Sequence, residues 1–367
     1  MQEVLVEVYR TRDTSFGNAR YVYSLIDEAK MNLGLRLMLH PDVNSMTNEQ
    51  LSTVELPDMQ KVFAAQGRKK LSLEVNEKLL KEGLAELNAL TGMNNVKEEI
   101  NELVKLVRFY KETGRDVLNK FSLHSIFTGN PGTGKTTVAR IVAKIYKGLG
   151  LLERGHIVEV DRESLVAGFS GQTAIKTGAK IEEAQGGILF IDEAYALAGK
   201  NSNDSFGQEA IQVILKRMED LRGQFGVIVA GYTDNMHEFV ESNPGLKSRF
   251  DRTFNFVDYT PEELYAIAVS ILAKEQIKPD EEAEAHLKAY FTHLHTQRDK
   301  HFGNARSVRQ VVAEAIKNQN LRLAELPSAE RTSEHLQTLT LSDVKEFEAG
   351  PAQQRTAGGS LGFKIGG

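Results

Sequence analysis

One segment of the chain, GNPGTGKT at residues 129–136, has the spacing of glycine, lysine and threonine that binds phosphate groups. It follows an apolar run that ends at Phe127 and precedes a stretch with helical periodicity, which is the strand–loop–helix context that phosphate binding requires. Glycines let the backbone wrap an anion because no Cβ blocks its approach, and the amides at the helix start then face that anion. We therefore predict that Lys135 reaches the outer phosphates of a nucleotide and that Thr136 binds Mg²⁺ through its hydroxyl. A glycine-rich turn without any ligand is the alternative interpretation.

A second segment, GILFIDE at residues 187–193, is an apolar run that ends in two acids. A carboxylate buried at a strand end is unfavourable unless it meets a cation or a hydrogen bond. Asp192 fits an outer ligand of Mg²⁺, and Glu193 fits the base that orients the attacking water. A polar strand end exposed at a loop is the alternative.

Two arginines, Arg249 and Arg252, lie in the segment NPGLKSRFDR at residues 243–252. Arginine suits developing phosphoryl charge because its planar fork donates several hydrogen bonds, and a neighbouring subunit can supply it in trans. The alternative is a pair of surface arginines that form ion pairs with Asp251 or Glu241.

Two further residues, Arg306 and Phe169, have both a functional and a structural interpretation. Arg306 begins a helix after FGNA at residues 302–305, where it could contact the γ-phosphate and report the nucleotide state, or could serve structure alone. Phe169 lies between glycines in AGFSG at residues 167–171. An aromatic side chain on such a loop usually packs into the core, whereas in a ring of such loops it can grip a peptide by stacking and apolar contact.

The composition narrows the class of protein. The net charge of −5 is a poor electrostatic match for a non-specific nucleic-acid binder. The chain has no cysteine, which excludes disulfides and cysteine-based zinc sites. No apolar run approaches the ~18 residues that span a bilayer, and the N-terminus lacks the pattern of a signal peptide. We expect a cytoplasmic protein without a membrane partner.

Short apolar runs alternate with helical segments in the middle of the chain, which predicts an α/β fold with a parallel sheet covered by helices on both faces. The runs lie at residues 125–128, 156–160, 187–191 and 226–230. Residues 73–113 are predicted to be helical. From Thr260 to about residue 348 the pattern is helical without strands, and residues 349–367 form a glycine-rich, flexible tail.

An internal repeat relates the two ends of the chain. Residues 12–37 read RDTSFGNARYVYSLIDEAKMNLGLRL, and residues 298–323 read RDKHFGNARSVRQVVAEAIKNQNLRL. After a one-residue slip, TNEQL at 47–51 parallels TSEHL at 332–336. The closing element of the main domain therefore also stands at the front of the chain. We predict that residues 1–65 are the lid-like end of an upstream module, so that the chain is a piece of a tandem protein or derives from one.

These motifs, in this order, resemble the CbbX/CfxQ branch of the AAA+ ATPases, which includes the red-type rubisco activases and stage V sporulation protein K. The resemblance rests on GNPGTGKTT, ILFIDEA, VIVAGY, NPGLKSRFDR and FGNARSVR and covers residues 85–348. It implies an AAA+ core at 85–259 and a helical lid at 260–348, preceded by a linker and leading helix at 66–84. It also implies ATP and Mg²⁺ as cofactors and a hexameric homo-oligomeric ring.

The resemblance assigns roles to individual residues. It makes Lys135, Glu193, Arg249 and Arg252 catalytic, with the two arginines as the arginine-finger pair, and Thr136 and Asp192 the metal-binding residues. It makes Arg306 the sensor 2 arginine and Phe169 the pore-loop aromatic, where the family usually has tyrosine. The segment AGYTD at 230–234 departs from the usual sensor 1 asparagine, and Thr233 is favoured there. The remaining nucleotide-binding positions are Gly92, Met93, Asn130, Pro131, Gly132, Thr133, Gly134 and Thr137.

The leading functional hypothesis is an ATP-driven remodeller that pulls a protein substrate through a central pore. One alternative is an AAA+ motor or loader that acts on nucleic acid, which predicts a basic pore surface. Another is a nucleotide-dependent scaffold, which predicts loss of Glu193 or of the arginines. A P-loop GTPase is disfavoured because no N-K-x-D sequence follows the P-loop.

Overall fold

The computed structural model of the protein describes residues 18–38, 46–58, 74–113, 117, 121–169, 171–198 and 205–347. It divides into two compact units, Met1–Ser72 and Leu73–Gly367. Residues 66–73 of the predicted linker and leading helix, and the predicted tail at 349–367, lie outside the described residues.

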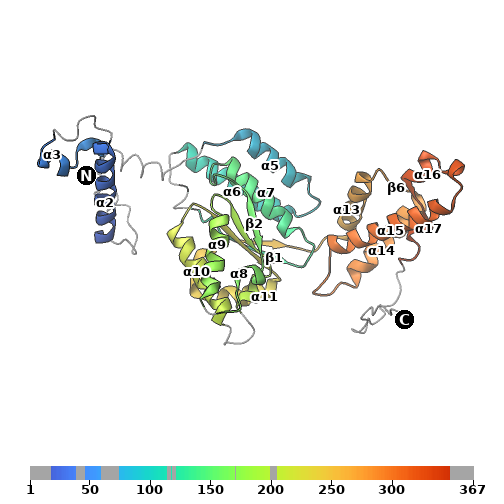
Figure 1. Ribbon diagram of the computed structural model, residues 1–367. Helices are drawn as coiled ribbons and strands as arrows, with labels where there is room; N and C mark the ends of the chain where they lie inside the picture. Colours follow the sequence, from blue (N-terminus) through green and yellow to red (C-terminus); the bar gives the residue numbers. More distant parts are fainter. Residues whose placement is uncertain are drawn as a thin grey trace, which may run out of the picture. The chain divides into compact units, whose positions relative to one another are not determined.

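A parallel five-stranded sheet forms the centre of the second unit (Figure 1), in the order β2-β3-β4-β1-β5. The strands are β1 (Ser125–Gly129), β2 (Ile157–Val160), β3 (Ile188–Ile191), β4 (Gly226–Gly231) and β5 (Thr253–Phe256). The first four confirm the predicted runs. The fifth was missed because its short segment TFNF alternates between exposed and buried residues and is not continuously apolar.

Helices cover both faces of this sheet, as Figure 1 shows, because successive side chains of each strand point to opposite faces. Ile188 and Phe190 of β3 pack in the cluster on one face, whereas Leu189 and Ile191 pack in the cluster on the other. The first face carries α5 (Glu77–Ala89), α6 (Asn94–Glu112) and α7 (Lys135–Gly148). The second carries α8 (Arg162–Leu165), α9 (Gln172–Glu183), η2 (Ala194–Leu197), α10 (Ser205–Asp220), α11 (Thr233–Glu241) and α12 (Pro244–Arg249). This arrangement confirms the predicted fold class.

A helical lid follows the sheet. Its elements are α13 (Pro261–Lys274), α14 (Glu281–Thr296), α15 (Ala305–Glu325), η3 (Ser328–Glu330), α16 (Ser333–Gln337) and α17 (Leu341–Val344). The prediction that no strand follows Thr260 is wrong, since β6 (Lys278–Pro279) pairs in parallel with β7 (Thr338–Leu339). Two-residue strands are too short to produce an alternating pattern that a sequence can reveal.

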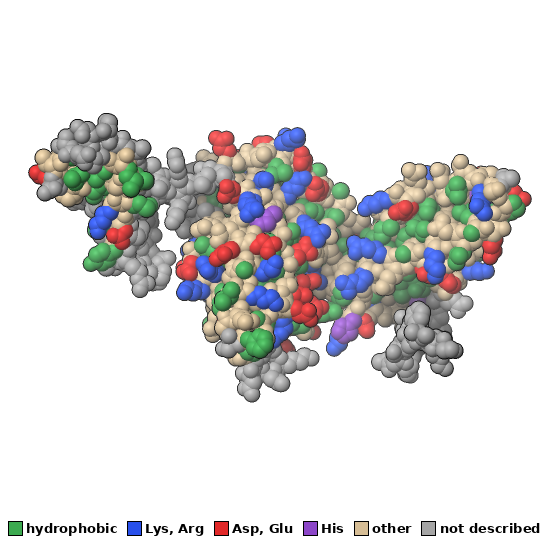
Figure 2. Space-filling view, in the orientation of Figure 1, with side chains coloured by type: hydrophobic (Ala, Val, Ile, Leu, Met, Phe, Trp, Pro, Cys, Tyr) green, Lys and Arg blue, Asp and Glu red, His purple; other side chains and the backbone are tan. Residues whose placement is uncertain are grey.

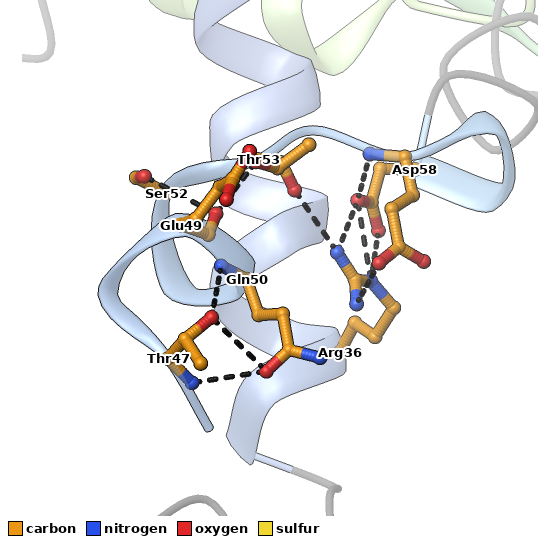
Figure 3. Close-up of polar contacts among 8 residues, drawn as sticks. Arg36, Thr47, Glu49, Gln50, Ser52, Thr53 and Asp58 are labelled. Carbon is orange, nitrogen blue, oxygen red and sulfur yellow. Dashed lines mark hydrogen bonds and ion pairs between the residues drawn. The ribbon is translucent and has the colours of Figure 1, made fainter.

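The first unit repeats contacts that hold the lid together. Helix α2 (Asn18–Met38) corresponds to α15, and α3 (Asn48–Ser52) corresponds to α16. In α2, Arg36 Nε donates to Asp58 Oδ1 at 3.0 Å and its Nη2 donates to the carbonyl of Thr53 at 3.2 Å (Figure 3). In α15, Arg322 makes the same two contacts with Asp343 and Thr338, at 2.8 and 3.3 Å.

The ion pair between Arg322 and Asp343 inside the lid is partly buried, and each of the two groups shifts the pKa of the other. Burial alone would raise the pKa of Asp343, but hydrogen bonds from Arg322 and Thr340 lower it below its usual value. The repeat in the sequence is therefore also a repeat of three-dimensional contacts. The side chain of Arg20, the counterpart of Arg306, lies outside the described residues.

His124 is a buried titratable residue that directly precedes strand β1. Its Nδ1 accepts a hydrogen bond from the backbone N–H of Val227 at 3.0 Å, and Phe225 and Phe250 pack against its ring. Burial, together with the charges of Arg249 and Arg222, lowers the pKa of His124 to about 4. The neutral imidazole is therefore the form that the fold accepts.

We expect acid to destabilise the protein through His124. The imidazole of the unfolded chain titrates near 6.5, so its stabilising contribution is complete above that pH and is lost as the pH falls towards 4. The total loss is on the order of 3 kcal/mol. Urea unfolding at pH 7.5 and pH 5 should show a smaller pH dependence for His124→Asn, which keeps an acceptor at the same place, than for the wild type. His237→Asn, at an exposed position, is the control. Equal pH dependence in all three proteins would contradict the prediction.

Candidate active site

The phosphate-binding loop joins β1 to α7 in left-handed backbone conformations. Gly132 and Gly134 have φ angles of 74° and 98°, a region where a side chain is disfavoured. A Cβ on Gly132 would also lie 2.1 Å from the carbonyl oxygen of Gly303 in the lid. The loop is therefore shaped both for an anion and for close approach of the lid.

Lys135 is turned towards this loop. Its Nζ donates to the carbonyl oxygens of Gly129 and Asn130, at 2.7 and 2.8 Å. Burial lowers the pKa of Lys135 to about 8 overall; the charges of Asp192 and Glu193 oppose this shift, and the charge of Arg306 adds to it. An anion placed among these groups would favour the charged ammonium.

A cavity of about 480 Å³ lies beside the loop, and most of the predicted nucleotide-site residues line it. These are Met93, Pro131, Gly132, Gly134, Lys135, Thr136, Thr137, Asp192, Glu193 and Arg306. Sequence reasoning missed the other part of the lining, which includes Leu90, Tyr232, Tyr259, Ile267, Ile271, Lys274 and Arg309. The apolar residues among them suit a flat ring, and the residues around the loop suit phosphates.

The two acids lie at the carboxyl end of β3 and face the cavity. Both side chains are exposed, and both line this cavity. Glu193 has a left-handed backbone, with φ 48° and ψ 43°, and caps the short helix η2. Arg162 Nη1 donates to the carbonyl of Ala196 at 2.7 Å and anchors that helix.

Two tyrosines that the sequence did not single out adjoin Glu193. The hydroxyl of Tyr195 hydrogen-bonds the Glu193 side chain, and burial followed by the charge of Glu193 raises the pKa of Tyr195 to about 12. Its ring lies against Gly231, where a Cβ would be 2.8 Å from Tyr195 Cδ1. The ring of Tyr232 lies 6.2 Å from that of Tyr195 and lines the cavity.

Thr233, favoured from the sequence as the water-positioning residue, does not line the cavity. It is the first residue of α11 and is exposed. Its neighbour Tyr232 directly follows β4, caps α11 and lines the cavity together with the acids. A one-residue difference at the end of a strand changes which side chain faces the site, and no pattern in AGYTD reveals where β4 ends.

The start of α15 is tied to the phosphate-binding loop by Asn304, which adopts a positive φ of 47°. Its Nδ2 donates to Asp258 Oδ1 at 2.7 Å, and its Oδ1 accepts from the backbone N–H of Tyr259 at 2.9 Å. The N–H of Ala305 donates to the carbonyl of Gly132 at 3.2 Å. These contacts bring Arg306 into the cavity lining and explain the role of FGNA before it.

Three predicted residues support the site from outside the lining. Asn130 Nδ2 donates to Asp258 Oδ1 at 3.0 Å. Thr133 is buried and donates to the carbonyl of Asn130 at 2.8 Å. Gly92 has a positive φ, and a Cβ there would lie 2.4 Å from Glu263 Oε1 in the lid.

The two arginines of segment 243–252 lie away from the nucleotide cavity. Arg249 lines a second cavity of about 410 Å³ and pairs with Glu219, with Nη2 3.2 Å from Oε2. The guanidinium of Arg252 lies over the ring of Phe121, 5.0 Å from its centroid. Of the carboxylates that the sequence suggested as partners, Glu241 pairs with Lys247 at 2.7 Å.

Phe169 is 72% exposed, so the alternative that it packs into the core is wrong. Added Cβ atoms at Gly168 and Gly171 would meet nothing within 4 Å. The base of the loop is held by Thr173, whose buried hydroxyl accepts from the N–H of Ala167 at 3.1 Å. The loop therefore presents an aromatic side chain from a fixed base.

Comparison with known proteins identifies the family. Residues 125–257 match the ATPase family associated with various cellular activities (AAA), and residues 1–70 and 260–356 match the AAA lid domain. The chain is 37% identical over 328 residues to stage V sporulation protein K of Bacillus subtilis, covering 88% of this chain and 98% of that protein. It belongs to the AAA+ ATPases of the CbbX and stage V sporulation protein K branch.

Other members of the branch are similarly close. Protein CbbX of Cereibacter sphaeroides is 40% identical, with 77% of this chain and 92% of that protein covered. The chloroplastic ribulose bisphosphate carboxylase/oxygenase activase of Cyanidioschyzon merolae is 39% identical, with coverages of 75% and 94%. The FIGL-1 AAA domain shares the fold, with a TM-score of 0.52, 15% identity and coverages of 84% and 91%. This AAA+ protein thus combines an AAA core with an AAA lid domain. No helix among its described residues is long and apolar enough to cross a membrane.

Proposed function

We propose that this AAA+ protein is a Mg²⁺-dependent ATPase that forms a cytoplasmic hexameric ring and remodels a protein substrate drawn into its pore. The observation that carries the ATPase part is the convergence on one cavity of Lys135, the acids Asp192 and Glu193, and the lid residue Arg306. One relative is named as a ribulose bisphosphate carboxylase/oxygenase activase, which supports a protein as the substrate.

Each of these residues would contribute one step. The loop amides and Lys135 would hold the phosphates, and Thr136 and Asp192 would hold Mg²⁺, which neutralises phosphate charge when bound. Glu193 would orient the attacking water and accept its proton. Arg306 would connect the γ-phosphate to the lid through the start of α15.

The location of the arginine-finger pair supports a ring. Arg249 and Arg252 do not line the nucleotide cavity of their own chain. Arginines that stabilise phosphoryl transfer can act on a neighbouring subunit's nucleotide, and a head-to-tail ring repeats that contact at every interface. We therefore assign both arginines to the ATP site of the next subunit.

The two alternatives lack supporting observations. A nucleic-acid motor would benefit from a basic surface, but the net charge is −5, and Figure 2 shows acidic and basic side chains mixed over the visible face of the second unit. A non-catalytic scaffold predicts the loss of Glu193 or the arginines, and all of them are present.

Substrate engagement is assigned to Phe169, whose exposure fits a side chain that contacts something outside its own chain. We expect Phe169→Ala to keep its melting temperature and basal ATPase rate but to lose stimulation by an unfolded polypeptide, such as reduced and carboxymethylated α-lactalbumin. Truncation of a buried Phe would instead cost ~3–5 kcal/mol. Leu321→Ala, which removes another exposed apolar side chain, is the matched control and should retain stimulation. Retained stimulation in Phe169→Ala would contradict the pore-loop role.

A further inference from the structure

Arg249 is held in one orientation by two elements. It ends the short helix α12, and its Nη1 donates to the carbonyl of Gly245 in that helix at 3.4 Å. Its Nη2 donates to Glu219 Oε2 of α10 at 3.2 Å. Its Nε is buried without a hydrogen-bond partner among the described residues. The inner part of the guanidinium is thus enclosed, and the two Nη groups form its partly exposed end.

Glu219 provides a rigid point of attachment. It lies near the end of α10, where the preceding residue Met218 is 2% exposed in the core and Ile214 is 4% exposed one turn earlier. The carboxylate is therefore attached to a helix that packs against the sheet. The short helix α12 depends instead on its cap, in which Asn243 Oδ1 accepts from the N–H of Gly245 at 2.8 Å.

The small contribution of this ion pair to stability indicates that its role is to position Arg249. The side chains of Arg249 and Glu219 are 30% and 47% exposed, and such surface pairs contribute only about 0–1 kcal/mol to stability. A long arginine side chain, by contrast, carries about 2 kcal/mol of rotamer entropy. If the ion pair holds Arg249 in place before the neighbouring subunit binds its nucleotide, part of this entropy cost is already met before the reaction begins.

We propose that Glu219 is a positioning residue that orients Arg249 for the ATP site of the neighbouring subunit. The inference rests on the trans role proposed above for Arg249. Glu219 does not contact the nucleotide of either subunit. It sets the direction of the guanidinium, so its loss affects turnover at the next site and leaves its own site intact.

Single variants give the first test. Glu219→Ala should lower kcat about tenfold, since misplacement of a reacting group by about 1 Å can cost up to ~10²-fold, with KM and melting temperature unchanged. Glu219→Gln keeps an acceptor for Arg249 and should recover most of the rate. The matched control is Glu241→Ala, which removes an exposed ion pair to Lys247 on the same helix α12 and should leave kcat unchanged. A faster Glu219→Ala enzyme, or equal loss in the control, would overturn the inference.

Mixed rings locate the effect. Arg249→Ala chains keep an intact ATP site, and Lys135→Ala chains supply an intact arginine, so their mixture should hydrolyse ATP at mixed interfaces. Adding Glu219→Ala to the Lys135→Ala chain should reduce this rescue about tenfold, whereas adding it to the Arg249→Ala chain should not. If the simple mixture fails, the trans role and this inference both fall. If the mixture works but Glu219→Ala has the same effect in either chain, the trans role stands and the positioning role of Glu219 is wrong.

Discussion

Glu193→Gln is expected to bind ATP with near-normal affinity and to hydrolyse it at least ~10²-fold more slowly, because general-base positioning contributes on that order. Glutamine keeps the size of the side chain and one oxygen that can accept from Tyr195. It removes the charge that we propose accepts the proton of the attacking water. The glycines of the phosphate-binding loop and Lys135, which we propose hold the phosphates, remain unchanged.

Two measurements separate binding from chemistry in this variant. Titration with a fluorescent ATP analogue should give an affinity close to that of the wild type, and phosphate release under single-turnover conditions should give the slower rate. Glu238→Gln, an exposed glutamate on α11, is the control. Normal turnover in Glu193→Gln would remove this residue from its assigned role, and loss of ATP affinity would indicate a binding role instead.

Arg249→Ala is expected to lower kcat by about 10³-fold, the lower end of the range for an arginine that stabilises phosphoryl transfer. The wild-type rate per subunit should also rise with protein concentration as rings form. In a random equal mixture of Arg249→Ala and Lys135→Ala chains, about a quarter of the interfaces combine an intact site with an intact arginine. The mixture should therefore recover up to about a quarter of the wild-type rate.

An ATP site that is completed by Arg249 of its own chain predicts a different result. If Arg249 served its own chain, neither partner in the mixture would have a complete site, and the mixed sample would stay as inactive as its components. A rate per subunit that is independent of concentration would point the same way. Arg252→Ala, tested in the same mixture, shows whether the arginine over Phe121 also acts across the interface.

The sequence determined the parts of this protein whose residues are contiguous. A phosphate-binding loop needs glycines, a lysine and a threonine within eight positions, and a strand that ends in two acids needs only its own apolar run. Both features therefore stood out before the structure was known. The same holds for the repeat of the lid, because corresponding positions such as Arg36 and Arg322 occur in the same order in both copies.

Only the tertiary structure decided which distant residues meet. Asn304 joins Asp258 and the phosphate-binding loop because the lid packs against the core, and the register at the end of β4 brings Tyr232, not Thr233, to the cavity. The pairing of Arg249 with Glu219 and the exposure of Phe169 likewise depend on how helices and loops pack. Contacts between elements far apart in the chain are set by the summed packing of many side chains, and local periodicity contains no information about that sum.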